Sequence, residues 1–203
     1  MYINDAAEII TIRELRESNP NVSFPLNPTI EQLAAYGVHP VTLKYPELAP
    51  GQRLGALGEA IIVDGVWEAT HAIADIPVDE IRVNKIAEIN ALHKEKLYTD
   101  VEVTFPAGLA TIQFRDEADR TNLSNVATGA MAYVIAGTPE AVMQYRTQDD
   151  VIQQVPAITM MQIAMTVLAA KQGVVDNAWS LKDSLKLLTT AQDILDYDIS
   201  IGW

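Results

Sequence analysis

The side chains that could carry chemistry in this chain are three histidines, several carboxylates and the serines. His39, His71 and His93 do not follow the H-x-x-x-H spacing that brings two metal ligands onto one helix face. The chain has no cysteine, which excludes disulfides, thiolate nucleophiles and cysteine metal sites together. We therefore predict no metal site.

The carboxylates are densest at residues 116–119 and at Asp149–Asp150. Two carboxylates perform acid–base catalysis only if burial drives their pKa values apart. The start of a predicted helix holds Asp116, Glu117 and Asp119, and a turn holds Asp149–Asp150. We therefore expect these carboxylates to cap the helix and to lie in solvent. The serines lack a G-x-S-x-G turn, and no glycine-rich phosphate loop follows a strand. The sequence predicts no catalytic residue, no cofactor site and no enzyme.

Charge and composition exclude some partners. With 14 Lys and Arg against 27 Asp and Glu, the net charge of −13 argues against nucleic acid, which requires clustered cations. The most apolar run, residues 158–170, is shorter than the roughly 20 residues of a membrane span. No basic segment followed by an apolar stretch begins the chain. We expect no membrane partner and synthesis in the cytoplasm.

The sequence predicts an α+β fold in three parts. These are a small N-terminal α+β module with a β-hairpin (residues 1–76), a long connecting helix (77–98), and a mostly helical C-terminal domain with short antiparallel strands (99–203). The connecting helix has an apolar face interrupted by Arg82, Lys85 and His93. This face fits packing against a neighbouring domain or subunit better than a strict coiled-coil seam.

Local signals define the N-terminal module. Capping boxes at Thr11 and Thr29 begin short helices at residues 12–18 and 30–36. Residues 38–45 are predicted to form a strand, and Pro40 requires either that the strand is an edge or that Pro40 stands among its first residues. Residues 46–58 lack strong periodicity, as in a loop. Asp64-Gly65 lies between two β-rich segments and predicts a hairpin.

The C-terminal domain is expected to hold two hairpins and several helices. The first hairpin spans residues 101–114, a helix covers 116–136, and two short strands follow at 142–145 and 151–155. Pro156 begins a helix that is apolar on nearly every side.

Two interpretations of where that helix ends remain open. It stops near Gly173, or it continues through Trp179, with Ser180 capping a fresh helix. Thr190 suggests a last short helix, and the alternating apolar tail ends at Trp203. Such apolar surface is expected to pack on this chain or on another copy. The residues predicted at a subunit interface are Ile86, Ile89, Met161, Met165, Leu168 and Trp203.

Several stretches resemble proteins of tailed bacteriophages. Residues 16–25 (RESNPNVSFP), 33–38 and 63–67 are similar to the N-terminal module of small tail and tail-fibre-associated proteins. Residues 85–136, which include Phe-Arg-Asp and Arg-Thr-Asn-Leu, and residues 179–182 resemble the uncharacterised C-terminal domain of the same proteins.

The resemblance implies a virion protein of the phage tail. It would be a non-enzymatic tail-fibre or baseplate-associated component that mediates subunit assembly and fibre attachment. Its partners would be other tail or fibre proteins, and a homo-oligomer, with a trimer favoured, is expected. The alternative is an assembly chaperone that promotes folding and trimerisation of the fibre.

Overall fold

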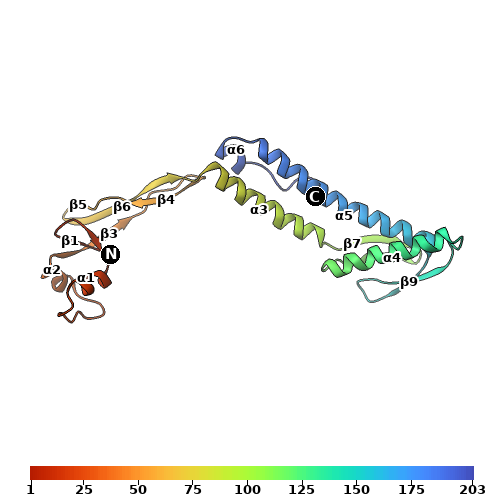
Figure 1. The fold of residues 1–203 in the computed structure, drawn as a ribbon, viewed down its shortest axis with the longest axis horizontal. Coiled ribbons are helices and arrows are strands. Elements are labelled where there is room, and N and C mark those ends of the chain that lie inside the picture. Colours follow the sequence, from red (N-terminus) through yellow and green to blue (C-terminus); the bar gives the residue numbers. More distant parts are fainter. The chain divides into compact units, whose positions relative to one another are not determined.

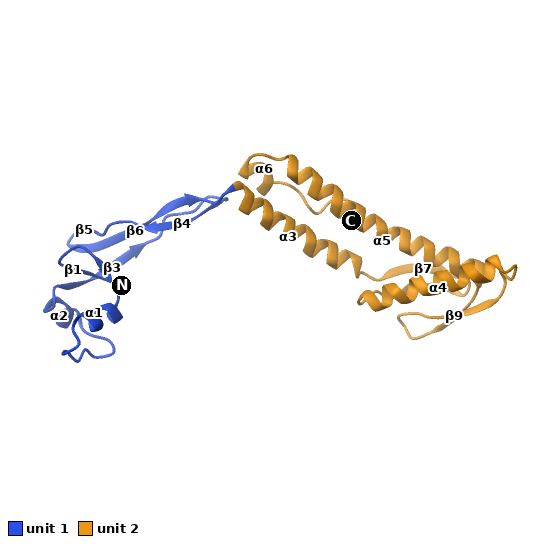
Figure 2. Cartoon of the chain, viewed as in Figure 1, with its two compact units in different colours: residues 1–77 blue, residues 78–203 orange.

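The computed structural model describes residues 1–203, which divide into two compact units, Met1–Pro77 (unit 1) and Val78–Trp203 (unit 2; Figure 2). Helices and small sheets occur together, which confirms the predicted α+β class. The connecting helix expected at residues 77–98 forms residues 78–97 and belongs to unit 2. Its apolar face lies against other helices of that unit, so it is part of a core.

Unit 1 is built on one sheet with the strand order β2-β1-β3-β6-β4, and β5 pairs with β6. Two short helices, α1 (Ile12–Ser18) and α2 (Ile30–Ala34), complete the unit (Figure 1). The strands are β1 (Tyr2–Asn4), β2 (Ile9–Ile10), β3 (Val38–Lys44), β4 (Gln52–Leu57), β5 (Ile61–Val63) and β6 (Val66–Asp75).

Both predicted capping boxes are present in unit 1. The Thr11 hydroxyl accepts from the Glu14 amide at 3.2 Å, and the Glu14 carboxylate accepts from the Thr11 amide at 2.6 Å. Thr29 and Gln32 repeat the arrangement at the start of α2. Each box satisfies two backbone amides that the first turn of a helix leaves free.

The predicted hairpin is also confirmed. Asp64 and Gly65 have positive φ values of 49° and 80°, the combination that a tight two-residue turn requires. Val63 is paired with Val66 across it, and Ile62 with Trp67.

Of the two positions expected for Pro40, the structure has the second, because Pro40 is the third residue of β3. The strand is not an edge, since β3 pairs with β1 through residues 38–40 and in parallel with β6 through residues 41–44. Pro40, which has no N–H, stands where β3 changes neighbours. The expectation of a loop at residues 46–58 was wrong, because this segment contains β4, whose pairing with β6 is irregular between Leu54 and Leu57. Gly55 lies in this irregularity, and it obscured the alternation that marks a strand.

Unit 2 combines four helices with two separate hairpins. Both hairpins and the helix between them were predicted, and Asp116 caps that helix. The elements are α3 (Val78–Leu97), β7 (Val101–Phe105), β8 (Gly108–Ile112), α4 (Glu117–Ile135), β9 (Val142–Arg146), β10 (Ile152–Pro156), α5 (Ala157–Leu187) and α6 (Ala191–Leu195).

Helix α5 runs without a break for 31 residues, through both Gly173 and Ser180. The fresh cap at Ser180 was therefore wrong. One continuous rod lets α5 pack on α4 with one part and on α3 with another, and this tertiary packing overrides the local stop signals (Figure 1).

The length of α5 also revises the expectation that its apolar run is too short for a membrane. By length and composition alone the helix would suffice to cross one, although core helices of soluble proteins pass the same test. Here Met160, Ala164 and Val167 of α5 are buried in the core of unit 2.

Arg82 and Lys85, which interrupt the apolar face of α3, donate hydrogen bonds to carbonyls at the ends of other helices. Arg82 donates to the Leu188 carbonyl at 3.0 Å, directly after α5, and Lys85 donates to the Leu195 carbonyl at 3.3 Å, at the end of α6. Cations stabilise the carbonyls that the last turn of a helix leaves free.

Candidate functional site

The six predicted interface residues do not form one surface. Ile89 is fully buried within the chain and is not available to a second subunit. Met161 and Leu168 pack against the core of unit 2, and Ile86 is half-buried. Trp203 is half-buried as well, and its Nε1 donates to the Ile199 carbonyl at 2.7 Å. Among the six, Met165 alone is mostly in solvent, at 52% exposure.

The apolar C-terminal tail packs on its own chain. The Asn177 side chain of α5 donates to the Ile201 carbonyl at 3.0 Å. Gly202 has a φ of +82°, and a Cβ there would lie 2.4 Å from Asn177 Oδ1. The close approach of tail and helix thus requires glycine at this position.

The three histidines lie in separate environments, and no group of three or more His, Asp or Glu side chains could hold a metal ion. His39 Nε2 lies 3.4 Å from Asp5, and His71 contacts the Gly55 carbonyl at 3.1 Å. His93 Nε2 is buried without a hydrogen-bond partner. Burial, and then the Lys182 charge, lower the pKa of His93.

Several predicted carboxylates cap and pair as expected. Asp116 Oδ1 accepts from the amides of Ala118 and Asp119, at 2.9 and 3.1 Å, and so caps α4. Asp149 accepts from the Thr147 hydroxyl at 2.6 Å. Asp150 pairs with Arg146 at 2.7 Å.

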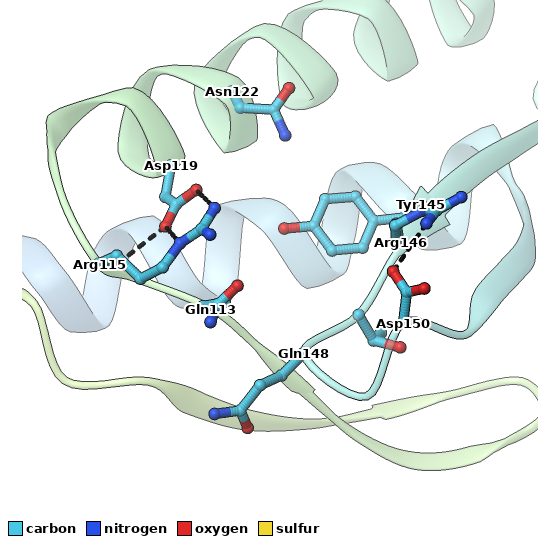
Figure 3. A pocket seen from close by; sticks show the side chains of 9 residues that line it. Gln113, Arg115, Asp119, Asn122, Tyr145, Arg146, Gln148 and Asp150 are labelled. Carbon is cyan, nitrogen blue, oxygen red and sulfur yellow. Dashed lines mark hydrogen bonds and ion pairs between the residues drawn. The ribbon is translucent and has the colours of Figure 1, made fainter.

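Asp119 and Asp150 both line a cavity of about 300 Å³ in unit 2 (Figure 3). The walls come from the segment after β8, the first turns of α4, the end of β9 and the loop that follows it. The lining is polar and consists of Gln113, Arg115, Asp119, Asn122, Tyr145, Arg146, Thr147, Gln148 and Asp150.

The Arg115–Asp119 pair forms one wall of this cavity. Nε and Nη2 of Arg115 each donate to Asp119 at 2.9 Å, and the Arg115 amide donates to the same carboxylate at 2.8 Å (Figure 3). Hydrogen bonds and the guanidinium charge lower the pKa of Asp119 to about 2, and the carboxylate raises the pKa of Arg115. Both groups are held ionised.

Tyr145 of β9 forms the floor. Its side chain is only 7% exposed, and its ring stacks on Phe105 with centroids 6.1 Å apart. The hydroxyl points into the cavity and forms no hydrogen bond with the protein (Figure 3). Burial, and then the nearby Asp119 charge, raise the pKa of Tyr145 to about 12, so the hydroxyl stays protonated at neutral pH.

A hydrogen-bond network joins this cavity to the end of α3. Gln148 donates to Asp100 at 2.7 Å, and Asp100 also accepts from the Phe114 amide at 2.7 Å. The Lys171 ammonium of α5 lies 4.7 Å from the centre of the Phe114 ring and donates to the carbonyls of Lys96, at 3.2 Å, and Thr99. Lys171 is buried, which lowers its pKa, and the contacts show that it caps α3.

Sequence reasoning missed both Lys171 and the cavity. Lys171 is the first charged residue of α5, and a lysine next to such an apolar stretch is an available signal, because a buried ammonium requires partners. The cavity gave no such signal, since its residues come from four segments with no fixed spacing.

A different kind of surface occurs in unit 1, where large aliphatic side chains stand exposed on β4, β5 and β6. Ile61 and Ile62 are 61% and 60% exposed. In the apolar clusters of unit 1, no residue of a helix packs against this part of the sheet. The exposed side chains are Leu54, Ile61, Ile62, Val63, Val66 and Ile73.

Comparison with known proteins identifies the family. A model described as a domain of unknown function (DUF4376) matches residues 80–200, more than half of the chain. The chain therefore belongs to this family. No curated protein and no solved structure matches it. The polar cavity and Lys171 lie inside the matched residues, whereas the exposed strands of unit 1 lie outside them.

Proposed function

We propose that the chain is a non-enzymatic structural component of a bacteriophage tail, a tail-fibre or baseplate-associated protein that mediates subunit assembly and fibre attachment. The observation that carries the proposal is the uncovered sheet of unit 1. The resemblance of residues 16–25, 33–38 and 63–67 to tail-associated proteins supplies the biological setting.

The exposed strands are apolar on both faces of the sheet. Successive side chains of a strand point to opposite faces, so Ile61 and Val63 share one face and Ile62 lies on the other. Ile62 is paired with Trp67, and Val63 with Val66, which continues each apolar face across the hairpin. These strands belong to a larger sheet, but apolar side chains left uncovered on its faces contribute no burial to its stability. Cover from other subunits would supply the missing burial.

Helix α5 in unit 2 carries further apolar surface. Met165, Trp179 and Leu187 are 52%, 58% and 80% exposed. Exposed apolar residues that stand singly are normal, but a set along one helix suits a contact between subunits. The proposed assembly is a homo-oligomer, with a trimer favoured, that contacts other tail or fibre proteins in the virion.

Mass spectrometry of purified phage particles tests the proposal. The expected result is this polypeptide at a fixed stoichiometry with the other tail proteins. Its absence from particles would reject the structural role.

The oligomeric state of the purified protein tests the physical basis. Light scattering after size exclusion is expected to give an oligomer that the double substitution Ile61→Ser with Val63→Ser shifts toward monomer. Leu26→Ser is the matched control, because Leu26 is 82% exposed but lies outside the sheet. A monomeric wild-type protein at high concentration would contradict the proposal.

An assembly chaperone that helps the fibre fold and trimerise is the second candidate. It is favoured by the net charge of −13, which would keep a transient partner soluble. Co-expression with the fibre protein separates the two candidates. A chaperone would raise the yield of folded trimeric fibre and leave no copy in the particle.

A further inference from the structure

We propose that the cavity beside Tyr145 in unit 2 binds a small, neutral, polyhydroxylated ligand, a single saccharide unit. This site goes beyond the proposed assembly role and does not depend on it, because the exposed strands of unit 1 take no part in the cavity.

The Tyr145 hydroxyl is the first observation. The side chain is 93% buried, and the rest of its surface packs into the core beside Phe105. The hydroxyl is the part of this buried side chain that reaches the open space of the cavity, where it is accessible to a ligand. It points into the cavity and has no partner in the protein (Figure 3). A ligand hydroxyl placed in the cavity would supply the partner.

The charge balance of the lining indicates a neutral ligand. Two arginines line the cavity, and each is paired with a carboxylate of the lining, Arg115 with Asp119 and Arg146 with Asp150. An anion would have to compete with these carboxylates for the guanidinium groups. The net charge of −13 adds a further barrier to an anion. A neutral molecule neither competes with the carboxylates for the guanidinium groups nor is repelled by the net negative charge.

The free polar groups match hydroxyls rather than an apolar molecule. Gln113 and Asn122 line the cavity, and their side-chain amides form no hydrogen bond with the protein (Figure 3). An amide offers both donors and acceptors, as does the Tyr145 hydroxyl. A sugar ring carries hydroxyls that donate and accept in several directions at once. Such groups would satisfy Gln113, Asn122 and Tyr145 together.

The volume limits the size of the ligand. At about 300 Å³ the cavity lies at the lower end of the roughly 300–1,000 Å³ found for small-molecule sites. This space suits one sugar ring, with any longer chain continuing into solvent.

Binding of free monosaccharides to the full-length protein tests the assignment. Glucose, galactose, mannose and N-acetylglucosamine are titrated separately and followed by saturation-transfer NMR, with inorganic phosphate as the anionic probe. We expect saturable binding of at least one sugar and none of phosphate. Failure of all four sugars to bind, or preferential binding of phosphate, overturns the proposal.

The substitution Tyr145→Phe locates the binding. It removes only the hydroxyl and is expected to weaken the sugar's affinity about tenfold, as the loss of one neutral hydrogen bond does. Tyr133→Phe is the matched control, because Tyr133 is 46% exposed on α4 and does not line the cavity. Asn122→Ala, which removes an exposed amide of the lining, is expected to weaken binding as well.

Thermal unfolding of Tyr145→Phe without sugar distinguishes a ligand role from a structural one. Because the hydroxyl has no protein partner, the melting temperature is expected to stay the same or rise. A large fall would show that the hydroxyl stabilises the fold, and unchanged sugar affinity in Tyr145→Phe would show that it does not contact the ligand. Either result rejects the proposal. Absence from phage particles bears on the assembly role alone.

Discussion

Units 1 and 2 differ in how many buried apolar residues they gather into one cluster. Unit 2 gathers twelve buried residues into one cluster, which includes Phe105, Phe114 and Leu123 and joins hairpins to helices. Unit 1 holds two clusters of three buried residues each, and it leaves aliphatic side chains of its strands in solvent. A small domain buries too little surface to be very stable alone. The contrast teaches that unit 2 is stabilised mainly by its core, whereas unit 1 depends more on local backbone features.

The first way to break this comparison is to remove a core side chain from unit 2. Phe114 is 1% exposed, and its ring also contacts the Lys171 ammonium. Phe114→Ala is expected to lower the free energy of unfolding by about 3–5 kcal/mol, because it leaves a cavity and removes a partner of a buried cation. Urea denaturation measures this change.

The control for this substitution is Val83→Ala in α3. Val83 is 64% exposed, so its truncation is expected to change the free energy of unfolding by less than about 0.5 kcal/mol. If Phe114→Ala cost no more than Val83→Ala, unit 2 would not be stabilised by the core described above.

The second prediction probes local backbone structure in unit 1. Gly65 has a φ of +80° in the turn between β5 and β6. A β-branched residue resists that conformation, so Gly65→Val is expected to destabilise unit 1 by about 1–3 kcal/mol. Thermal unfolding of the wild type and the variant measures the loss. An unchanged transition would mean that the turn does not hold the hairpin.

Gly173→Ala in α5 is the matched control, since this glycine lies in a helix interior and a Cβ there meets no atom within 4 Å. Alanine loses less conformational freedom than glycine when a helix forms. The substitution is therefore expected to stabilise unit 2 by about 0.5–1 kcal/mol, the opposite sign to Gly65→Val.

Features written in neighbouring residues could be predicted from the sequence, and features that depend on distant packing could not. The capping box of Thr11 and Glu14 and the Asp64-Gly65 turn are short-range hydrogen-bond and backbone geometries, and both occur as expected. The continuity of α5 through Ser180 depends on contacts with α3 and α4 far along the chain. No local pattern encodes these contacts.

The candidate site was less predictable than the fold for the same reason. Asp119 attracted notice as a carboxylate near a helix start, and solvation was the expected role. Its pairing with Arg115 is local, four residues apart. The approach of Tyr145 requires β9 to pack beside α4, and neither segment indicates it alone. Among the predicted interface residues, Ile89 is covered by its own chain, and its spacing on α3 could not tell packing within the chain from packing between chains.

The third and smallest prediction measures how much the Arg115–Asp119 ion pair adds to the free energy of unfolding of unit 2, beside its core. The folded pKa of Asp119 is about 2, below its usual value of 3.8, so the unfolded chain binds more protons between these values. Stabilisation by this carboxylate is therefore fully present above about pH 4 and is lost as the pH falls toward 2. The Asp119 side chain is 17% exposed but Arg115 is 67% exposed, so solvent screening limits the contribution to about 1–2 kcal/mol.

Asp119→Asn removes the charge while keeping the shape of the side chain. At neutral pH the variant is expected to be about 1–2 kcal/mol less stable than the wild type, and the difference should shrink as the pH falls from 4 to 2. Urea denaturation across this range measures it. Glu117→Gln is the control, because Glu117 is 61% exposed and lies 3.4 Å from Arg120, so its loss should cost less at every pH. A difference that does not change with pH between 4 and 2 would mean that ionisation of Asp119 is not coupled to folding, and the charge of the ion pair would then add nothing to what the core of unit 2 already provides.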